Sequence, residues 1–175
     1  MKRSTMEVTL MPMQPDRIGF YPVCARDYLE PLRLLKGWVE HLVFCDIKCV
    51  PKSSRELLDL RETVKIEGLP QPSFILGDAL FAISSLRPVD VFFLRRDSDG
   101  EGGSELHLLG PARLPMVLDL IKPGGLLVTD RSNGRDWFDE FRLKRRSAYR
   151  LHGREINLAE SQPWVEHKLL SFTVQ

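Results

Sequence analysis

The chain lacks several features from which function is usually inferred. Its 25 basic and 24 acidic residues leave no net field of one sign that would attract nucleic acid or an acidic membrane. No apolar run approaches the roughly 20 residues of a membrane-spanning helix. Charge and proline follow the basic start MKRST before any apolar segment forms, so we expect no signal peptide and a cytoplasmic protein.

Common ligand motifs are also missing. Cys24, Cys45 and Cys49 are an odd number of thiols, which indicates reduced cysteines. The spacing of Cys45 and Cys49 suits half of a zinc site, but no second Cys/His pair has ligand spacing, so we expect no metal. The chain contains neither G-x-G-x-x-G nor a Walker lysine, which argues against a nicotinamide dinucleotide enzyme and a phosphate loop.

What the sequence does contain is an alternation of short apolar strands with helices. Residues 1–16 are proline-punctuated and expected to be irregular, except for a candidate strand at 7–10, and residues 17–175 are expected to form one domain. Parallel strands are predicted at 17–21, 41–47, 73–76, 89–94 and 126–129. Helices are predicted at 28–36 with Asp27 as N-cap, after Ser53 or Ser54, and at 79–86, 108–121 and 134–143.

Three further segments complete the predicted architecture. The stretch 61–72 is ambiguous and includes a candidate strand at Val64–Glu67, and Lys122–Gly125 reads as a tight turn. Two consecutive strands near the C-terminus predict an antiparallel closing pair. The fold class is therefore α/β: a doubly wound, mostly parallel sheet of about seven strands with a C-terminal antiparallel strand pair and helices on both faces.

Short motifs occur in a recognisable order along these strands. Asp46 follows the second strand, Gly77-Asp78-Ala79 the third, Asp90 begins the fourth, and Lys122-Pro-Gly-Gly precedes the fifth. Over roughly residues 17–175 this order resembles the class I S-adenosylmethionine (SAM)-dependent methyltransferases. The resemblance implies that SAM is the cofactor, that Asp46 holds its ribose hydroxyls, and that Asp78 receives the adenine amino group. For Asp46 the alternative is a solvated strand end, and for Asp78 it is a helix N-cap.

The first loop departs from that family, because the glycine-rich turn is replaced by Tyr21-Pro-Val-Cys-Ala-Arg-Asp27. Glycine suits such a turn because it has no Cβ to block the approach of a ligand. Either the cofactor binds through an altered turn, with Arg26 or Asp27 reaching its methionine end, or it does not bind. The candidate cofactor-binding residues are Tyr21, Cys24, Asp27, Asp46, Ile47, Asp78 and Ala79.

Two polar loops follow the fourth and fifth strands. The loop 95–104 is the densest polar segment, but it is not an EF-hand, because the twelfth position from Asp97 is Leu108 rather than Glu. The resemblance places acceptor chemistry here, with Arg96, Asp97 and Glu101 as candidate catalytic residues and Asp130 and Asn133 as candidate substrate-binding residues. The alternatives are a solvated turn for the first loop and turn formation and helix capping for the second.

Two functions of different classes remain open. One is a SAM-dependent methyltransferase of unknown acceptor, in which Asp97 or Glu101 acts as a base. The other is a methyltransferase-like binding or interaction module that has lost its cofactor. Basic residues between Arg142 and Arg154 suit a nucleic-acid backbone, but a solvated helix end and strand face is the favoured interpretation.

Overall fold

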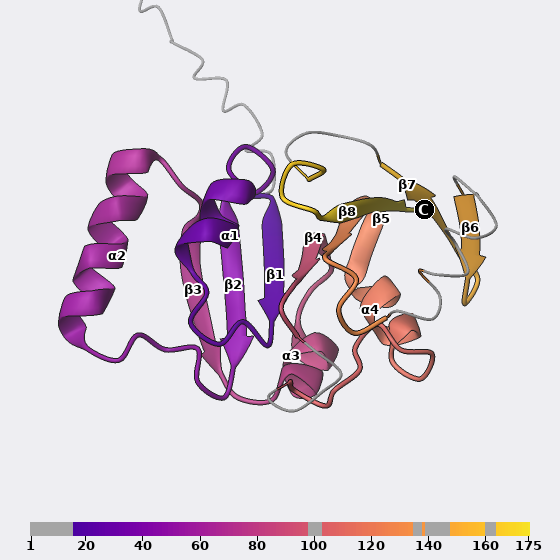
Figure 1. Cartoon of the computed structure of the whole chain (residues 1–175), viewed down its shortest axis with the longest axis horizontal. Helices are drawn as coiled ribbons and strands as arrows, with labels where there is room; N and C mark the ends of the chain where they lie inside the picture. Colours follow the sequence, from indigo (N-terminus) through magenta and orange to yellow (C-terminus); the bar gives the residue numbers. More distant parts are fainter. Residues whose placement is uncertain (1–15, 98–102, 135–137, 139–147, 160–163) are drawn as a thin grey trace, which may run out of the picture.

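One sheet of eight strands organises the computed structural model, which describes residues 16–97, 103–134, 138, 148–159 and 164–175. The strand order across the sheet is β3-β2-β1-β4-β5-β8-β7-β6, with β3 and β6 at opposite ends (Figure 1). The strands are β1 Ile18–Pro22, β2 His41–Asp46, β3 Gln71–Leu76, β4 Val89–Leu94, β5 Ile121–Thr129, β6 Ala148–Leu151, β7 Arg154–Leu158 and β8 Leu170–Val174.

The first five strands are parallel, and the last three continue the sheet with antiparallel neighbours. β1 pairs with β2 on one side and β4 on the other, while β8 runs antiparallel to both β5 and β7. The predicted fold class is thus confirmed, with a closing group of three strands in place of the expected pair. Since the strand order reverses between β1 and β4, the ligand-binding crevice is expected outside the carboxyl ends of these two strands.

Helices cover both faces of the sheet. Helices α1 (Leu29–Leu34) and α2 (Ser54–Glu67) share a buried cluster with Tyr21, Phe44 and Phe93. Helices α3 (Ala79–Ser85) and α4 (Leu114–Leu120) share the other cluster, which includes Phe20 and Phe92. Neighbouring residues of one strand enter opposite clusters because side chains alternate along a strand. The two buried clusters, one on each face of the sheet, therefore hold β1 and β4 from both sides.

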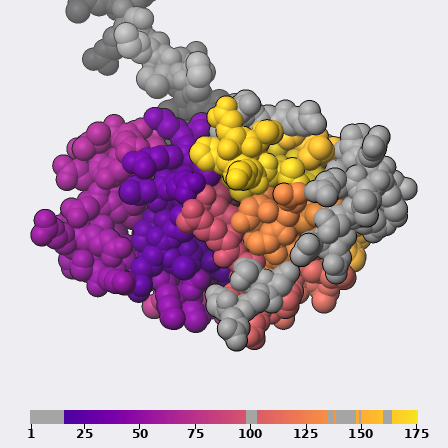
Figure 2. All heavy atoms as spheres, viewed as in Figure 1, coloured from indigo at the N-terminus to yellow at the C-terminus, as the bar shows by residue number. Residues whose placement is uncertain are grey.

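The C-terminal segment packs against the α1 side of the molecule. Trp164, which is buried, lies with its ring 5.4 Å from that of Trp38, between centroids. His167 Nδ1 lies 3.9 Å from a carboxylate oxygen of Glu30 in α1. Figure 2 shows the yellow C-terminal segment against the indigo N-terminal part on this face.

Helix α2 corrects the expected strand at Val64–Glu67. Ser53 caps its start by accepting a hydrogen bond from the Glu56 amide at 3.2 Å, and Gly68 ends it in the left-handed conformation, with φ of 59°. Both are standard helix terminators, so the whole interval between them is helical. Leu60 and Val64 are buried four residues apart, which is helical spacing.

Four other expectations are wrong in detail. The predicted helix at 108–121 begins only at Leu114, and the Lys122–Gly125 stretch belongs to β5, where the register with β4 shifts between Val89 and Val91. The first helix begins at Leu29 without a side-chain cap, so Asp27 is not its N-cap. The predicted third strand begins two residues earlier, at Gln71.

Some expectations lie outside the described residues: the irregular segment 1–15 with its candidate strand, and most of the predicted helix at 134–143. Within the described part of the chain, helices are too short or too polar to cross a bilayer.

Candidate functional site

A pocket of about 420 Å³ opens at the carboxyl edge of the sheet. Residues that follow β1, β2, β3 and β4 line it, so it lies across the point where the strand order reverses. Its lining residues are Val23, Ala25, Asp46, Ile47, Lys48, Gly77, Asp78, Ala79, Arg96, Asp97, Gly103, Ser104 and Leu106. A volume of this size lies in the range of small-molecule and cofactor sites.

Two predicted nucleoside contacts, Asp46 and Asp78, lie in this pocket with Ile47 and Ala79. The Asp46 carboxylate accepts backbone hydrogen bonds from Ala25 at 3.0 Å and Lys48 at 2.9 Å, one on each oxygen. Each carboxylate oxygen has two acceptor sites, so each retains one for a ligand hydroxyl. Asp78 caps α3 through one oxygen, which accepts from the Leu80 amide at 2.6 Å. The capping alternative is therefore present, and the pocket contact is compatible with it.

The first loop makes a glycine-type turn without glycine. Val23 and Ala25 have φ of 48° and 46°, in the left-handed region, and both line the pocket. This conformation is unfavourable for residues with a Cβ, and most so for a β-branched residue such as Val23. The backbone conformation that glycine ordinarily supplies is thus kept here by two residues that carry a Cβ, and the Val23 side chain packs against the core cluster that contains Phe20 and Phe92.

Backbone hydrogen bonds join the same loop to β2 and close a turn within it. The Cys24 amide donates to the Cys45 carbonyl at 3.4 Å, and the Asp27 amide to the Cys24 carbonyl at 3.0 Å. The predicted cofactor residues Tyr21, Cys24 and Asp27 do not line the pocket. Tyr21 and Cys24 are buried in the core cluster that also holds α1. Their observed contacts hold the loop in place.

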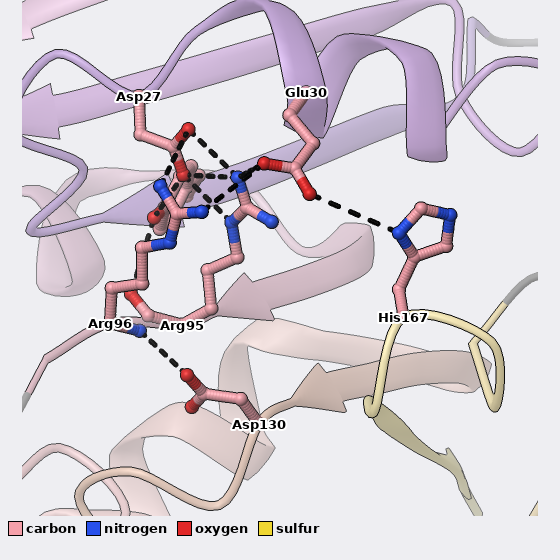
Figure 3. A network of polar contacts seen from close by, with 7 residues as sticks. Asp27, Glu30, Arg95, Arg96, Asp130 and His167 are labelled. Atoms are coloured by element: carbon pink, nitrogen blue, oxygen red, sulfur yellow. Dashed lines mark hydrogen bonds and ion pairs between the residues drawn. The ribbon is translucent and has the colours of Figure 1, made fainter.

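Asp27 belongs to a network that ties the first loop to the end of β4 (Figure 3). Arg95 donates to both oxygens of Asp27 at 2.7 and 2.8 Å, and to Glu30 at 2.6 Å. The Tyr21 hydroxyl lies 3.2 Å from Asp27 Oδ2 and 3.2 Å from the Arg95 carbonyl oxygen. The Arg95 side chain is 6% exposed and that of Asp27 18%, so the ion pair between them is largely buried.

The pKa values in this network follow from its geometry. Burial lowers the pKa of Arg95, but its hydrogen bonds to Glu30 and Asp27 outweigh that and leave the pKa raised. The hydrogen bond from Arg95 lowers the pKa of Glu30 against the opposing effect of burial. Burial and the Asp27 charge raise the pKa of Tyr21. All these shifts favour an ionised Arg95–Glu30 pair beside a neutral tyrosine.

Asp97 is also buried, at 3% exposure, and three donors surround its carboxylate. The Ser104 amide and hydroxyl donate at 2.7 Å each, and the Asn133 side-chain amide donates to the second oxygen. These bonds join the two ends of the loop that leaves β4 to the loop after β5. Asp97 lines the pocket, whereas Asn133 does not.

Asp130 likewise holds backbone at the pocket rim. It accepts from the Arg96 amide at 2.9 Å and from the Ser132 amide at 2.9 Å. Arg96 has a left-handed φ of 60°, so Asp130 stabilises an unfavourable turn beside the pocket. Glu101, the remaining candidate, lies outside the described residues.

Comparison with solved structures places this geometry among known folds. A methyltransferase homologue from Pyrococcus horikoshii is similar over 91% of this chain and 61% of its own, with a TM-score of 0.50 and 13% sequence identity. The chain has a class I methyltransferase-like fold.

Two further solved structures match at lower TM-scores. An rRNA methylase from Streptococcus thermophilus matches over 91% of this chain and 87% of its own, with a TM-score of 0.47 and 13% identity. A protein from Streptococcus mutans, assigned as a methyltransferase and solved in complex with SAH, matches over 91% and 89%, with a TM-score of 0.47 and 11% identity. Neither a protein-family model nor a curated protein matches the sequence.

The cysteines of this methyltransferase-like fold are unsuited to nucleophilic chemistry. All three are buried, and burial raises the pKa of Cys24 and Cys49, and that of Cys45 to about 12. A thiol with a raised pKa carries little thiolate at neutral pH. The described residues also contain no cluster of side chains with metal-ligand geometry.

Of the basic residues between Arg142 and Arg154, the structure describes Arg150, His152 and Arg154. Arg154 donates to the backbone carbonyls of Leu118, Ile121 and Gln175, so its guanidinium holds the end of the sheet to α4. Arg150 is exposed, and residues 142–146 lie outside the described part.

Sequence reasoning did not identify the Arg95 network or the pocket contacts of Val23, Ala25, Lys48, Ser104 and Leu106. One signal was available for Arg95: it directly follows the fully buried run Val91–Leu94. A buried arginine needs paired carboxylates, but its partners lie 65 and 68 residues away in sequence, and no local pattern names them.

Proposed function

We propose that this protein is a SAM-dependent methyltransferase whose nucleoside site is the pocket at the carboxyl edge of the sheet. The observation that carries the proposal is the open space beside Asp46 and Asp78. Tyr21 is in the core, and Arg26 lines a different hollow, between the first loop and α2, so neither fills that space.

The pocket residues suit a nucleoside. Asp46 offers one remaining acceptor site on each carboxylate oxygen, which matches two neighbouring ribose hydroxyls. Asp78 is exposed and retains an oxygen for an amino group, and the half-exposed to exposed apolar side chains of Ile47 and Leu106 flank the pocket. When bound, SAM supplies an electrophilic methyl group on its sulfonium sulfur.

The residues after β4 position the reacting groups under this proposal. Because the carboxylate of Asp97 accepts three hydrogen bonds, we propose that its role is to position the loop that ends at Ser104. Within the described residues these donors take three of the four acceptor sites of the carboxylate, so a base drawn from Asp97 would have one site, on Oδ1, to accept a proton. Methyl transfer to an acceptor that is already nucleophilic requires only that the acceptor be aligned with the methyl carbon.

Calorimetric titration with S-adenosylhomocysteine tests the proposal. We expect a micromolar Kd for the wild type and at least about tenfold weaker binding for Asp46→Asn, which loses a charged acceptor. Asp119→Asn is the matched control, because its side chain is 78% exposed in α4, away from the pocket. Absence of heat with either S-adenosylhomocysteine or SAM at high protein concentration would contradict the proposal.

The second candidate function, a binding module without cofactor, rests on the first loop. Val23 and Ala25 place side chains where glycines ordinarily allow close approach, and Asp27 is held by Arg95. Under that function the pocket binds neither S-adenosylhomocysteine nor SAM, and Ala25→Gly does not make it bind either ligand.

A further inference from the structure

The proposed nucleoside site leaves one end of the pocket without a described ligand contact. Asp78 and Asp46 follow β3 and β2, and the pocket continues past β1 to Arg96 and Asp97 after β4. A ligand whose ribose lies at Asp46 therefore directs its other end toward β4. The amino-acid part of SAM would lie there, and it carries a carboxylate and an ammonium group.

Arg96 is the cation at that end. Its side chain is 64% exposed, in contrast to the 6% exposed Arg95 next to it. Arg95 takes the short contacts to Asp27 and Glu30, at 2.6–2.8 Å, whereas Arg96 lies 3.7 Å from Asp27 and 3.4 Å from Glu30. Figure 3 shows both guanidinium groups at the same two carboxylates.

The two arginines therefore differ in how tightly they bind the carboxylates of Asp27 and Glu30. Asp27 and Glu30 carry two negative charges and the two arginines two positive ones, so the group is neutral overall, but Arg95 takes the short buried contacts and leaves Arg96 the long ones at the surface. Within the described residues, the guanidinium of Arg96 makes one hydrogen bond, at 3.4 Å, and a guanidinium has five N–H donors. Such a group can exchange its long contacts for a bidentate bond to a ligand carboxylate.

The backbone holds Arg96 at this position. Its φ of 60° is an unfavourable conformation for arginine, and the Asp130 carboxylate fixes it by accepting from the Arg96 amide. Unfavourable backbone that its surroundings stabilise is common at ligand-binding positions. The carboxylate of Asp130, which follows β5, is thereby hydrogen-bonded to the backbone amide of Arg96.

We infer that Arg96 recognises the carboxylate at the amino-acid end of the nucleoside ligand, a role taken here by a side chain in place of the missing glycine turn. The inference rests on the proposed function and adds a specificity-determining residue to it. Arg96 lines the same pocket as Val23 and Ala25, and its exposed guanidinium would have to leave its long contacts to Asp27 and Glu30 to bind the ligand carboxylate.

Paired titrations of S-adenosylhomocysteine and its decarboxylated analogue, which differ only in the carboxylate, test the inference. We expect Arg96→Gln to weaken S-adenosylhomocysteine binding by about tenfold or more and to change binding of the analogue less than about twofold. Glutamine keeps a Cβ at this left-handed position, removes the charge and shortens the side chain, and Arg131→Gln makes the same change outside the pocket. Arg131→Gln is the matched control, because Arg131 is an exposed arginine with φ of 73° that does not line the pocket.

The outcomes separate this inference from the proposed function. Equal weakening of both ligands by Arg96→Gln would overturn the inference but would not contradict the proposed function, because the wild type still binds the nucleoside. Selective loss in Lys48→Gln, with no selective loss in Arg96→Gln, would also overturn it, because Lys48 is the cation at the Asp46 end of the pocket. A wild type that binds neither ligand would contradict the proposed function itself and the inference with it.

Discussion

Two neighbouring arginines, Arg95 and Arg96, should differ sharply in their contribution to stability. Arg95 makes three short charge-assisted hydrogen bonds and is 6% exposed, and among the described residues its loss leaves Asp27, with an 18% exposed side chain, only the 3.7 Å ion-pair contact to Arg96. Removing one partner of a buried ion pair costs about 3–5 kcal/mol. Glu30 is 43% exposed and regains water, so we take the lower end, about 3 kcal/mol, for Arg95→Met.

Arg96→Met is the matched control for this prediction. It makes the same chemical change one residue later, but its contacts are long and its side chain is 64% exposed. Exposed pairs contribute about 0.2–1 kcal/mol, so we expect a loss of less than about 1 kcal/mol. For a chain of this length the two variants should melt roughly 6–12 °C and less than about 4 °C below the wild type, respectively.

Urea unfolding followed by tryptophan fluorescence measures both variants. Trp38 and Trp164 are in contact with each other on the α1 side, so their emission reports on the layer that the network supports. A double-mutant cycle adds Asp27→Asn, which should cost little once Arg95 is absent, giving a coupling of at least about 1 kcal/mol. Equal unfolding free energies for Arg95→Met and Arg96→Met would refute the assignment of the first loop's anchor to Arg95.

Three further predictions follow from the same geometry. Ala25→Gly should stabilise the fold by about 0.5–1 kcal/mol in urea unfolding. A left-handed φ costs a residue with a Cβ about 1–2 kcal/mol, and the larger backbone entropy of glycine in the unfolded chain offsets part of the gain. Ala82→Gly inside α3 is the control and should destabilise the fold by about 1 kcal/mol. Because Glu30 has a lowered pKa in the folded state, its contribution is present above the unfolded pKa of about 4.3 and is lost as pH falls through the folded pKa; Glu30→Gln should therefore flatten the acid limb of stability against pH, and an unchanged limb would contradict the pairing. A maleimide should label the three buried cysteines at pH 8 only after unfolding, because burial raises their pKa values, and rapid labelling of native protein would contradict that burial.

The positions of the strands along the chain could be predicted from sequence because each buried strand is marked locally. Runs such as His41–Ile47 and Val89–Leu94 are apolar and flanked by turn residues, and the polar residues after them, including Asp46 and Asp78, indeed lie at one edge. The helical end of α2 was also within reach, because Gly68 is a standard helix terminator four residues after Val64.

The roles of individual side chains were less predictable, because they depend on distant partners. Asp27 has the sequence context of an N-cap, yet its carboxylate pairs with an arginine 68 residues later. Asp97 and Asn133 are polar loop residues in sequence, and only the adjacency of β4 and β5 shows that one bonds the other. The left-handed conformation of Val23 was similarly hidden, since local propensity disfavours it.

A crystal structure of the protein soaked or co-crystallised with S-adenosylhomocysteine tests the central claim most directly. The account predicts the ribose hydroxyls on the Asp46 carboxylate, the adenine amino group at Asp78, and the carboxylate of the ligand at Arg96. An empty pocket at saturating ligand, or a nucleoside bound elsewhere on the molecule, would contradict it.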